Sequence, residues 1–229
     1  MSKLKKTLFT LNLNPDEYKE ITDMTYPLLK HYANKIGADF YEIKERKFPD
    51  WPPNYEKMQI YQLGREMKND WNIFFDCDAM VCPDTPDVTN YIPKDTVAHN
   101  GKDMAGIRFK YDRFFWRDGR NIGSASWCCI ASDWCLELFE PVPDMTPEDV
   151  QNSIFPITNE LKNAVSPIRL VEDYVMARNI AKYGLKFTTL KEIFEDLKLG
   201  KFSFFYHLYA VPREEKVRKM QDIYKVWGF

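Results

Sequence analysis

The sequence lacks the features that mark a membrane-spanning, secreted or nucleic-acid-binding protein. No apolar run approaches the roughly 18 residues that a membrane-spanning helix needs, and the chain start has no signal-peptide core. With 32 Lys and Arg against 34 Asp and Glu, the net charge is -2, which argues against general affinity for nucleic acid or acidic membranes. The five cysteines are an odd number without metal-type spacing. We therefore expect a cytoplasmic protein with reduced cysteines, no membrane span and no nucleic-acid partner.

Apolar residues are numerous enough to form a substantial core. Hydrophobic residues make up 45% and aromatic residues 15% of the 229 residues, which excludes a disordered chain. This length suits one large domain, or one domain with a small appendage. The chain ends in the apolar run Trp227-Gly228-Phe229, which leaves open that it is one module of a longer protein.

Strands and helices are predicted to alternate in the first third of the chain. A helix start at Asn14-Pro15 and a stop at Gly37 bound the first helix, and Pro27 should kink or split it. The alternation predicts a mostly parallel sheet covered by helices, with ligands at the carboxyl ends of its strands. The expected elements are strands at 7–13, 39–44 and 71–75, and helices at 15–36 and roughly 55–68.

The second half of the chain is less regular. A segment at 121–131 could be a strand that leads to a helix capped by Ser132, and we expect Trp127 and Trp134 to be core residues. The C-terminal tail from Pro212 should be an amphipathic helix. Further expected elements are strands at 105–109, 185–189 and 202–209, and a helix at 171–183.

Two acidic residues follow the third predicted strand. Asp76 and Asp78 come directly after the apolar run Ile73-Phe74-Phe75, and no other aspartates in the chain lie two positions apart. Alternate residues of a strand face the same way, so that both carboxylates can reach one ion. Hard divalent cations prefer oxygen ligands, and Mg²⁺ or Mn²⁺ commonly bridge carboxylates to phosphates. The alternative to a metal site is a pair of solvated acids at a strand end.

A hydrophobic strand that ends in Asp-X-Asp, behind a first strand that ends in Thr10-Leu11-Asn12, resembles the GT-A nucleotide-sugar glycosyltransferases. The resemblance covers most of the chain. It implies a single Rossmann-like α/β domain, with a mostly parallel central sheet flanked by helices and a C-terminal helix. In that domain, residues 1–100 would form the nucleotide- and metal-binding half, and residues 101–229 the acceptor-binding half with the C-terminal helix.

The resemblance also implies roles for individual residues. Asp76, Asp78 and the late His207 would hold the metal, and the acidic pair Glu172-Asp173 would be catalytic on the acceptor side. Cys77 lies between the two aspartates, and the resemblance includes it in the donor-binding segment. The remaining residues expected to bind the donor or its hydroxyl groups are Thr10, Leu11, Asn12, Lys57, Asp103, Asn121 and Gly123.

The implied reaction moves a sugar from a nucleoside diphosphate, with a UDP-sugar favoured, to a hydroxyl of a carbohydrate or glycoconjugate acceptor. Mn²⁺ or Mg²⁺ would neutralise the charge that grows on the leaving diphosphate. In an inverting mechanism, Asp173 would deprotonate the acceptor. In a retaining mechanism the diphosphate can serve as the base, and the run from Tyr55 to Val81 also resembles retaining galactosyl- and glycogenin-like enzymes. We favour inversion.

Two functions of other classes stay open. A nucleotidyltransferase that makes nucleotide sugars also uses an α/β sheet and an acidic metal site, but it typically carries a glycine-rich basic loop after the first strand. The corresponding segment here, LNLNPDEY, has no glycine. A sugar- or metal-binding module without turnover is the other alternative, and the presence of both aspartates and an acidic candidate base disfavours it.

Overall fold

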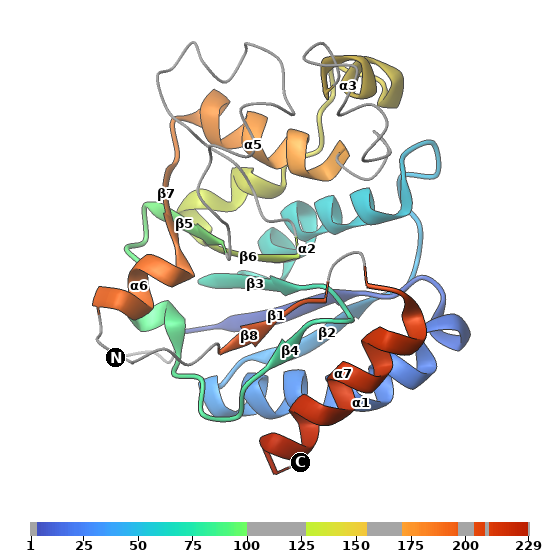
Figure 1. Ribbon diagram of the computed structural model, residues 1–229. Helices are drawn as coiled ribbons and strands as arrows, with labels where there is room; N and C mark the ends of the chain where they lie inside the picture. The colour runs from blue at the N-terminus through green and yellow to red at the C-terminus, as the bar shows by residue number, and fades with distance from the viewer. Residues whose placement is uncertain (1–3, 100–126, 155–170, 197–203, 209–210, 229) are drawn as a thin grey trace.

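A six-stranded sheet forms the centre of the protein, with helices on both of its faces (Figure 1). The computed structural model describes residues 4–99, 127–154, 171–196, 204–208 and 211–228. The order of strands across the sheet is β2 (Asp39–Ile43), β1 (Lys6–Leu11), β3 (Trp71–Phe75), β6 (Cys128–Ser132), β5 (Thr96–His99) and β7 (Lys186–Thr189).

The sheet is mostly parallel, with one reversed strand. β1 pairs in parallel with both β2 and β3, and β5 pairs in parallel with β7. β6 lies between β3 and β5 and runs antiparallel to both. The predicted α/β class with a central, mostly parallel sheet is therefore confirmed. The reversal at β6 follows from pairing with neighbours that lie far away in the sequence, and periodicity within one strand carries no information on direction.

One face of the sheet is covered by α1 (Pro15–Ile36). Leu29, Tyr32 and Ala33 of this helix share a buried cluster with Ile73 and Phe75 of β3. The helix ends as predicted, since Gly37 adopts a left-handed conformation with φ of 67°.

The expectation that Pro27 would split α1 is wrong, because the helix is one continuous element. Pro27 lies on the exposed side, so the carbonyl group that loses its hydrogen bond can be solvated. Ile21, Leu28 and Leu29 are buried on either side of the proline and hold both segments against their neighbours.

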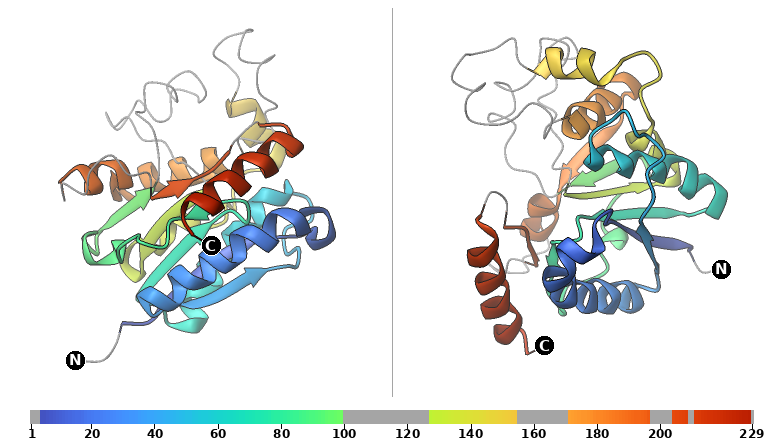
Figure 2. Two further views of the ribbon diagram at one scale, coloured as in Figure 1. Left: turned by 60° about the horizontal axis from the view of Figure 1, so that its bottom comes forward. Right: turned by 90° about the vertical axis from the view of Figure 1, so that its right-hand side faces the viewer.

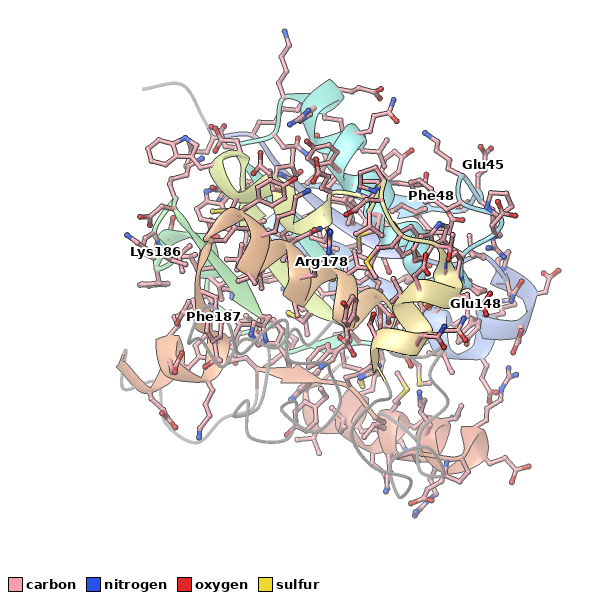
Figure 3. All side chains as sticks on the ribbon, turned by 90° about the horizontal axis from the view of Figure 1, so that it is seen from above. Glu45, Phe48, Glu148, Arg178, Lys186 and Phe187 are labelled. Atoms are coloured by element: carbon pink, nitrogen blue, oxygen red, sulfur yellow. The ribbon has the colours of Figure 1, made fainter. Side chains whose placement is uncertain are left out.

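The other face is covered by several shorter helices. Figure 3 looks onto this layer and shows Arg178 on α5 with Glu148 on α3 to one side. Arg178 Nη2 donates a hydrogen bond of 2.7 Å to Asp144, which ties α5 to the loop before α3. The elements of this layer are η1 (Pro53–Gln59), α2 (Ile60–Met67), η5 (Asp133–Phe139), α3 (Pro147–Ile154) and α5 (Val171–Tyr183).

The helix expected at 55–68 is divided into a 3₁₀ segment, η1, and the α-helix α2. The buried side chain of Glu56 anchors the first part to the preceding loop. Its carboxylate accepts hydrogen bonds of 2.8 and 2.9 Å from the backbone N–H groups of Lys47 and Phe48, and one of 2.7 Å from Gln59. These bonds fasten the preceding loop to η1 and fix the position of the next residue, Lys57.

The predicted cap at Ser132 is confirmed, because its hydroxyl group accepts a hydrogen bond from Trp134 N at the start of η5. The expectation that Trp134 belongs to the core is wrong, since 67% of this residue is exposed. Trp134 follows the cap directly, and the inward positions of η5 are taken by Cys135, Leu136 and Leu138.

A two-stranded sheet stands beside the main one and joins distant parts of the chain. β4 (Met80–Val81) pairs antiparallel with β8 (Phe205–Tyr206). Two short helices, η2 (Val88–Asn90) and α6 (Leu190–Asp196), complete the described elements together with the C-terminal α7 (Arg213–Val226). Figure 2 shows α7 alongside α1.

The amphipathic tail predicted from Pro212 is confirmed as α7. Val217 and Met220 are buried against Ile21 and Leu28 of α1 and Met80 of β4. Of the strand predicted at 202–209, the described residues contain only the pair that forms β8. The strand expected at 105–109 lies outside the described residues. In the part of the chain that the structure describes, every helix is too short or too polar to cross a membrane.

Candidate metal-binding site

The two aspartates lie in a tight turn at the carboxyl end of β3. Asp76 N donates a hydrogen bond of 2.8 Å to the carbonyl oxygen of Trp127, and Ala79 N donates one of 3.0 Å to Asp76 O. Thr25 of α1 donates its hydroxyl hydrogen to the carbonyl oxygen of Cys77 at 2.5 Å. The turn is thus held from both sides, while the buried side chain of Cys77 belongs to the core.

His207 reaches the aspartates through the small sheet. Because Met80 pairs with Tyr206, the next residue after β8 lies opposite the turn that precedes β4. The Nε2 atom of His207 is 3.2 Å from Oδ1 of Asp78 and 3.8 Å from Oδ2 of Asp76. One ligand atom from each of the three residues lies within 4.8 Å of the others. The structure therefore brings together the three residues that were predicted from the sequence as metal ligands.

Trp127 supports this arrangement through two separate contacts. Its ring stacks on the imidazole of His207, with centroids 5.0 Å apart and planes 16° apart. Its carbonyl oxygen accepts the hydrogen bond from Asp76 N. The prediction that Trp127 is a core residue misses this role, since the side chain is only half-buried and lies against the site.

A lysine ammonium accompanies each aspartate. Lys57 Nζ is 3.5 Å from Oδ1 of Asp76, and Lys216 Nζ is 2.7 Å from Oδ2 of Asp78. In both aspartates the other oxygen is the one that faces His207. Each carboxylate therefore presents one oxygen to a lysine and one to the centre of the site.

The charged neighbours of Asp78 keep it ionised. Its side chain is only 13% exposed, and burial alone would raise its pKa. The hydrogen bond and charge of His207 and the ammonium of Lys216 outweigh burial and hold the pKa of Asp78 well below its usual range. Asp78 is thus a carboxylate at neutral pH, as a metal ligand must be.

Lys57 connects the metal-binding turn with the start of α5. Its side chain is 1% exposed, lies over the ring of Phe74 at 4.6 Å, and places Nζ 3.8 Å from Oε1 of Glu172. Burial would lower the pKa of Lys57, but the carboxylates of Asp76 and Glu172 hold it above its ordinary value. Asn54 donates a hydrogen bond to the other carboxylate oxygen of Glu172.

The two acids of the predicted catalytic pair lie in different environments. Glu172 is 5% exposed, and burial raises its pKa to about 7, although Lys57 acts in the opposite direction. Asp173, in the same first turn of α5, is only half-buried. Its charge raises the pKa of both Lys57 and Glu172, so Asp173 belongs to the same electrostatic group.

The carboxyl end of β1 carries buried polar atoms that have no hydrogen-bond partner among the described residues. They are Oγ1 of Thr10 and Oδ1 of Asn12, on side chains that are 0% and 3% exposed. The Nδ2 atom of Asn12 donates to Glu42 Oε1 at 3.3 Å. Leu11 packs against the core cluster of the α5 side. Three expected donor-binding residues lie outside the described part of the chain, namely Asp103, Asn121 and Gly123.

The donor set fits a divalent cation such as Mn²⁺. Two carboxylate oxygens and an imidazole nitrogen converge within 4.8 Å of one another. Mn²⁺ accepts carboxylate ligands and tolerates imidazole, whereas Mg²⁺ prefers oxygen ligands throughout. Sequence reasoning missed Lys216, because a lysine in the first turns of an amphipathic helix gives no signal that distinguishes it from its solvated neighbours.

No protein-family model and no curated protein matches the sequence. Among solved structures, the chain is similar to a glycosyltransferase involved in the glycosylation of the major capsid of PBCV-1. The two are 12% identical, the match covers 96% of this chain and all of the other, and the TM-score is 0.53. This likeness establishes a shared fold: the chain has a glycosyltransferase fold.

Two further solved structures are similar at lower scores. One is a mutant of Drosophila β1,4-galactosyltransferase 7 in complex with manganese, UDP-Gal and xylobiose, which is 12% identical over 94% of this chain and 80% of the other, with a TM-score of 0.42. The second is the glycosyltransferase GlyE of Streptococcus pneumoniae, which is 10% identical over 99% of this chain and 64% of the other, with a TM-score of 0.41.

Proposed function

We propose that the protein is a divalent-metal-dependent glycosyltransferase, which moves a sugar from a nucleoside diphosphate to a hydroxyl group of a carbohydrate or glycoconjugate. The observation that carries this proposal is the convergence of Asp76, Asp78 and His207 at the carboxyl end of β3, within a glycosyltransferase fold. In a sheet of this kind, ligands bind at the carboxyl ends of the strands. We place the protein in the cytoplasm, in keeping with its five free cysteines.

The donor nucleotide would lie along the carboxyl ends of β1 and β3, which are neighbouring parallel strands. The unpartnered buried atoms of Thr10 and Asn12 are suited to hydrogen bonds with a base or ribose, because a buried polar atom without a partner is costly. The Oδ1 atom of Asn12 offers an acceptor, which complements the imide N–H group of uracil. We therefore propose a UDP-sugar as donor.

The chemical barrier is the departure of the diphosphate while positive charge builds on the sugar carbon. A bound Mn²⁺ or Mg²⁺ neutralises charge on the leaving oxygens. Asp76, Asp78 and His207 would hold that ion, and the ammonium of Lys57 adds a fixed positive charge behind Asp76. The residues of the chain thus supply an environment that is already arranged for negative charge before the reaction begins.

Asp173 is the proposed general base of an inverting mechanism. Glu172 is engaged by Lys57 and Asn54 and is almost fully buried, which suits a supporting role. Asp173 is more exposed in the same helical turn and can meet an acceptor hydroxyl. In this proposal, Asp173 takes the hydroxyl proton as the acceptor oxygen attacks the sugar carbon opposite the leaving diphosphate.

The test is a screen of UDP-, GDP-, dTDP- and CMP-linked sugars for binding, with and without Mn²⁺. We expect a rise in melting temperature with UDP-sugars that requires Mn²⁺, since a ligand at a hundredfold excess over its Kd stabilises by about 2.7 kcal/mol. Asp78→Asn should abolish the rise, whereas Asp84→Asn, on the exposed loop after β4, should keep it. A folded wild-type protein that binds none of the donors would refute the proposal.

Measurement of turnover distinguishes the transferase from the two alternatives, a nucleotidyltransferase and a binding module without turnover. We expect slow Mn²⁺-dependent hydrolysis of the donor, which releases nucleoside diphosphate, and no release of pyrophosphate. The anomeric configuration of the freed sugar, read by NMR before it equilibrates, reports the stereochemistry. An inverted product, together with loss of turnover in Asp173→Asn, would support Asp173 as the base. A product with retained configuration would contradict it.

A further inference from the structure

Lys216 is a charged neighbour of the metal-binding site that belongs to the C-terminal helix. Its Nζ atom donates a hydrogen bond of 2.7 Å to Oδ2 of Asp78, and both side chains are largely buried, at 15% and 13% exposure. The Oδ1 atom of Asp78, which faces His207, is not used by the lysine. Lys216 therefore leaves one oxygen of Asp78 available to a cation while it adds a positive charge beside that cation.

We propose that Lys216 makes metal binding and donor binding depend on each other, so that the metal binds weakly alone and tightly together with a nucleoside diphosphate. This inference rests on the proposed function. It assigns Lys216 as a positioning residue that acts through Asp78.

The charges explain the proposed coupling. The carboxylates of Asp76 and Asp78 carry two negative charges, and the ammonium groups of Lys57 and Lys216 carry two positive ones. A divalent cation that enters this group is attracted by the carboxylates, and the ammonium of Lys216 beside it offsets part of that attraction. A diphosphate brings negative charge to the same place and compensates the positive charge of Lys216. By linkage, the factor by which the diphosphate tightens metal binding equals the factor by which metal tightens diphosphate binding.

Lys216, rather than Lys57, is the residue on which this coupling can be tested. Lys57 is shared between Asp76 and Glu172 and is fully buried, so its removal would leave carboxylates uncompensated inside the protein. Asp78, the partner of Lys216, also has His207 at 3.2 Å, so removal of the lysine does not leave this carboxylate alone. The helix of Lys216 is seated by Val217 and Met220 against α1, and those contacts do not involve the ion pair. A Lys216 variant should therefore fold.

The experiment measures the Kd of Mn²⁺ by calorimetric titration, in the absence and in the presence of saturating UDP. Lys216→Met keeps the apolar stem and removes the charge, and Lys216→Arg keeps the charge. The matched control is Lys219→Met on the same helix, where the lysine is 42% exposed and pairs with Glu215. Circular dichroism confirms that each variant is folded.

We expect Lys216→Met to bind Mn²⁺ alone about tenfold more tightly than the wild type, because one nearby like charge is gone. UDP should then tighten Mn²⁺ binding about tenfold less than it does in the wild type. Lys216→Arg and Lys219→Met should both match the wild type. This pattern separates an effect of charge from one of packing.

Three other results would overturn the role of Lys216. Unchanged or weaker Mn²⁺ binding by folded Lys216→Met overturns the inference, and it leaves the proposed function in place provided that the wild type binds Mn²⁺ and UDP. Absence of Mn²⁺ binding by the wild type even in the presence of saturating UDP overturns the metal site and this inference together. A shift of the same size in Lys219→Met would show a general effect of helix charge and would also overturn the role of Lys216.

Discussion

The Nε2 atom of His207 lies 3.2 Å from Oδ1 of Asp78, although these residues lie far apart in the sequence. The contact depends on the pairing of β4 with β8, two strands of two residues each. The metal-binding group is thus complete only when the C-terminal segment has docked on the N-terminal half. A measurement of metal affinity therefore tests the docking of the C-terminal segment as well as the proposed function.

His207 should contribute directly to metal affinity. We expect His207→Gln to weaken Mn²⁺ binding by at least about tenfold, since one of three protein ligands is lost and even residues that only support a ligand are worth 10–100-fold. Calorimetric titration of Mn²⁺ measures this change. His31→Gln, on the exposed side of α1, is the control and should bind Mn²⁺ like the wild type. Equal affinity in His207→Gln would remove this residue from the ligand set.

The buried pair Lys57 and Glu172 should be strongly coupled in stability. Lys57→Met leaves the carboxylate of Glu172 buried without its ammonium partner, and breaking a buried pair in this way costs about 3–5 kcal/mol of unfolding free energy. Adding Glu172→Gln removes that carboxylate and should recover part of the loss. Urea unfolding of the two single variants and the double variant measures the coupling. Additive losses would mean that the pair does not interact.

The raised pKa of Glu172 predicts a pH dependence of stability with a definite sign. The ordinary pKa of about 4.5 applies to the unfolded chain, whereas burial raises the pKa to about 7 in the folded protein. Between these values the folded state binds more protons, so the contribution is fully present below about pH 4.5 and is lost as pH rises through 7. The loss is on the order of 3 kcal/mol.

Glu172→Gln should remove this decline. Urea unfolding of the wild type and the variant at a series of pH values from 5 to 8 gives the difference in unfolding free energy between them. That difference should shift in favour of the variant as pH rises. A difference that is constant across the series would show that the pKa of Glu172 is the same in both states.

Gly64 permits the close approach of α2 to the sheet. A Cβ atom at this position would lie 2.5 Å from Oδ1 of Asn72 on β3 and 3.1 Å from a methyl group of Leu136. Gly64→Ala should therefore destabilise the protein by about 1–3 kcal/mol, despite the better helix propensity of alanine. Thermal unfolding measures the loss. Gly184→Ala would not be a suitable control because its φ is +64°, and Glu66→Ala on the exposed face of α2 serves instead.

The sequence was sufficient for the first half of the sheet. The strands and helices from β1 to β3 have apolar periodicity, a helix start at Asn14-Pro15 and a stop at Gly37, which are local signals. It was also sufficient to nominate Asp76 and Asp78, because their spacing after a buried strand is itself a local pattern. β5 was missed, because its four residues are all buried and show no alternation.

Other features required the folded chain. Nothing in the sequence distinguishes Trp127, which stacks on His207, from the exposed Trp134. Lys216 and Lys219 are equally ordinary lysines of one amphipathic helix, and only the docking of α7 on α1 directs the first toward Asp78. A local sequence pattern predicts backbone conformation and burial, but it does not predict which distant residue a side chain contacts.

By itself, the sequence determined an α/β domain with two ionisable acids at the tip of a buried strand, because hydrophobic periodicity and residue spacing are properties of short segments. The tertiary structure decided which charges surround those acids. Lys57, His207 and Lys216 come from η1, the residue after β8, and α7. They meet at one turn because η1 packs on one face of the sheet while β8 and α7 pack on the side of α1. Long-range packing therefore set the electrostatic character of the site, while local chemistry set its position in the chain.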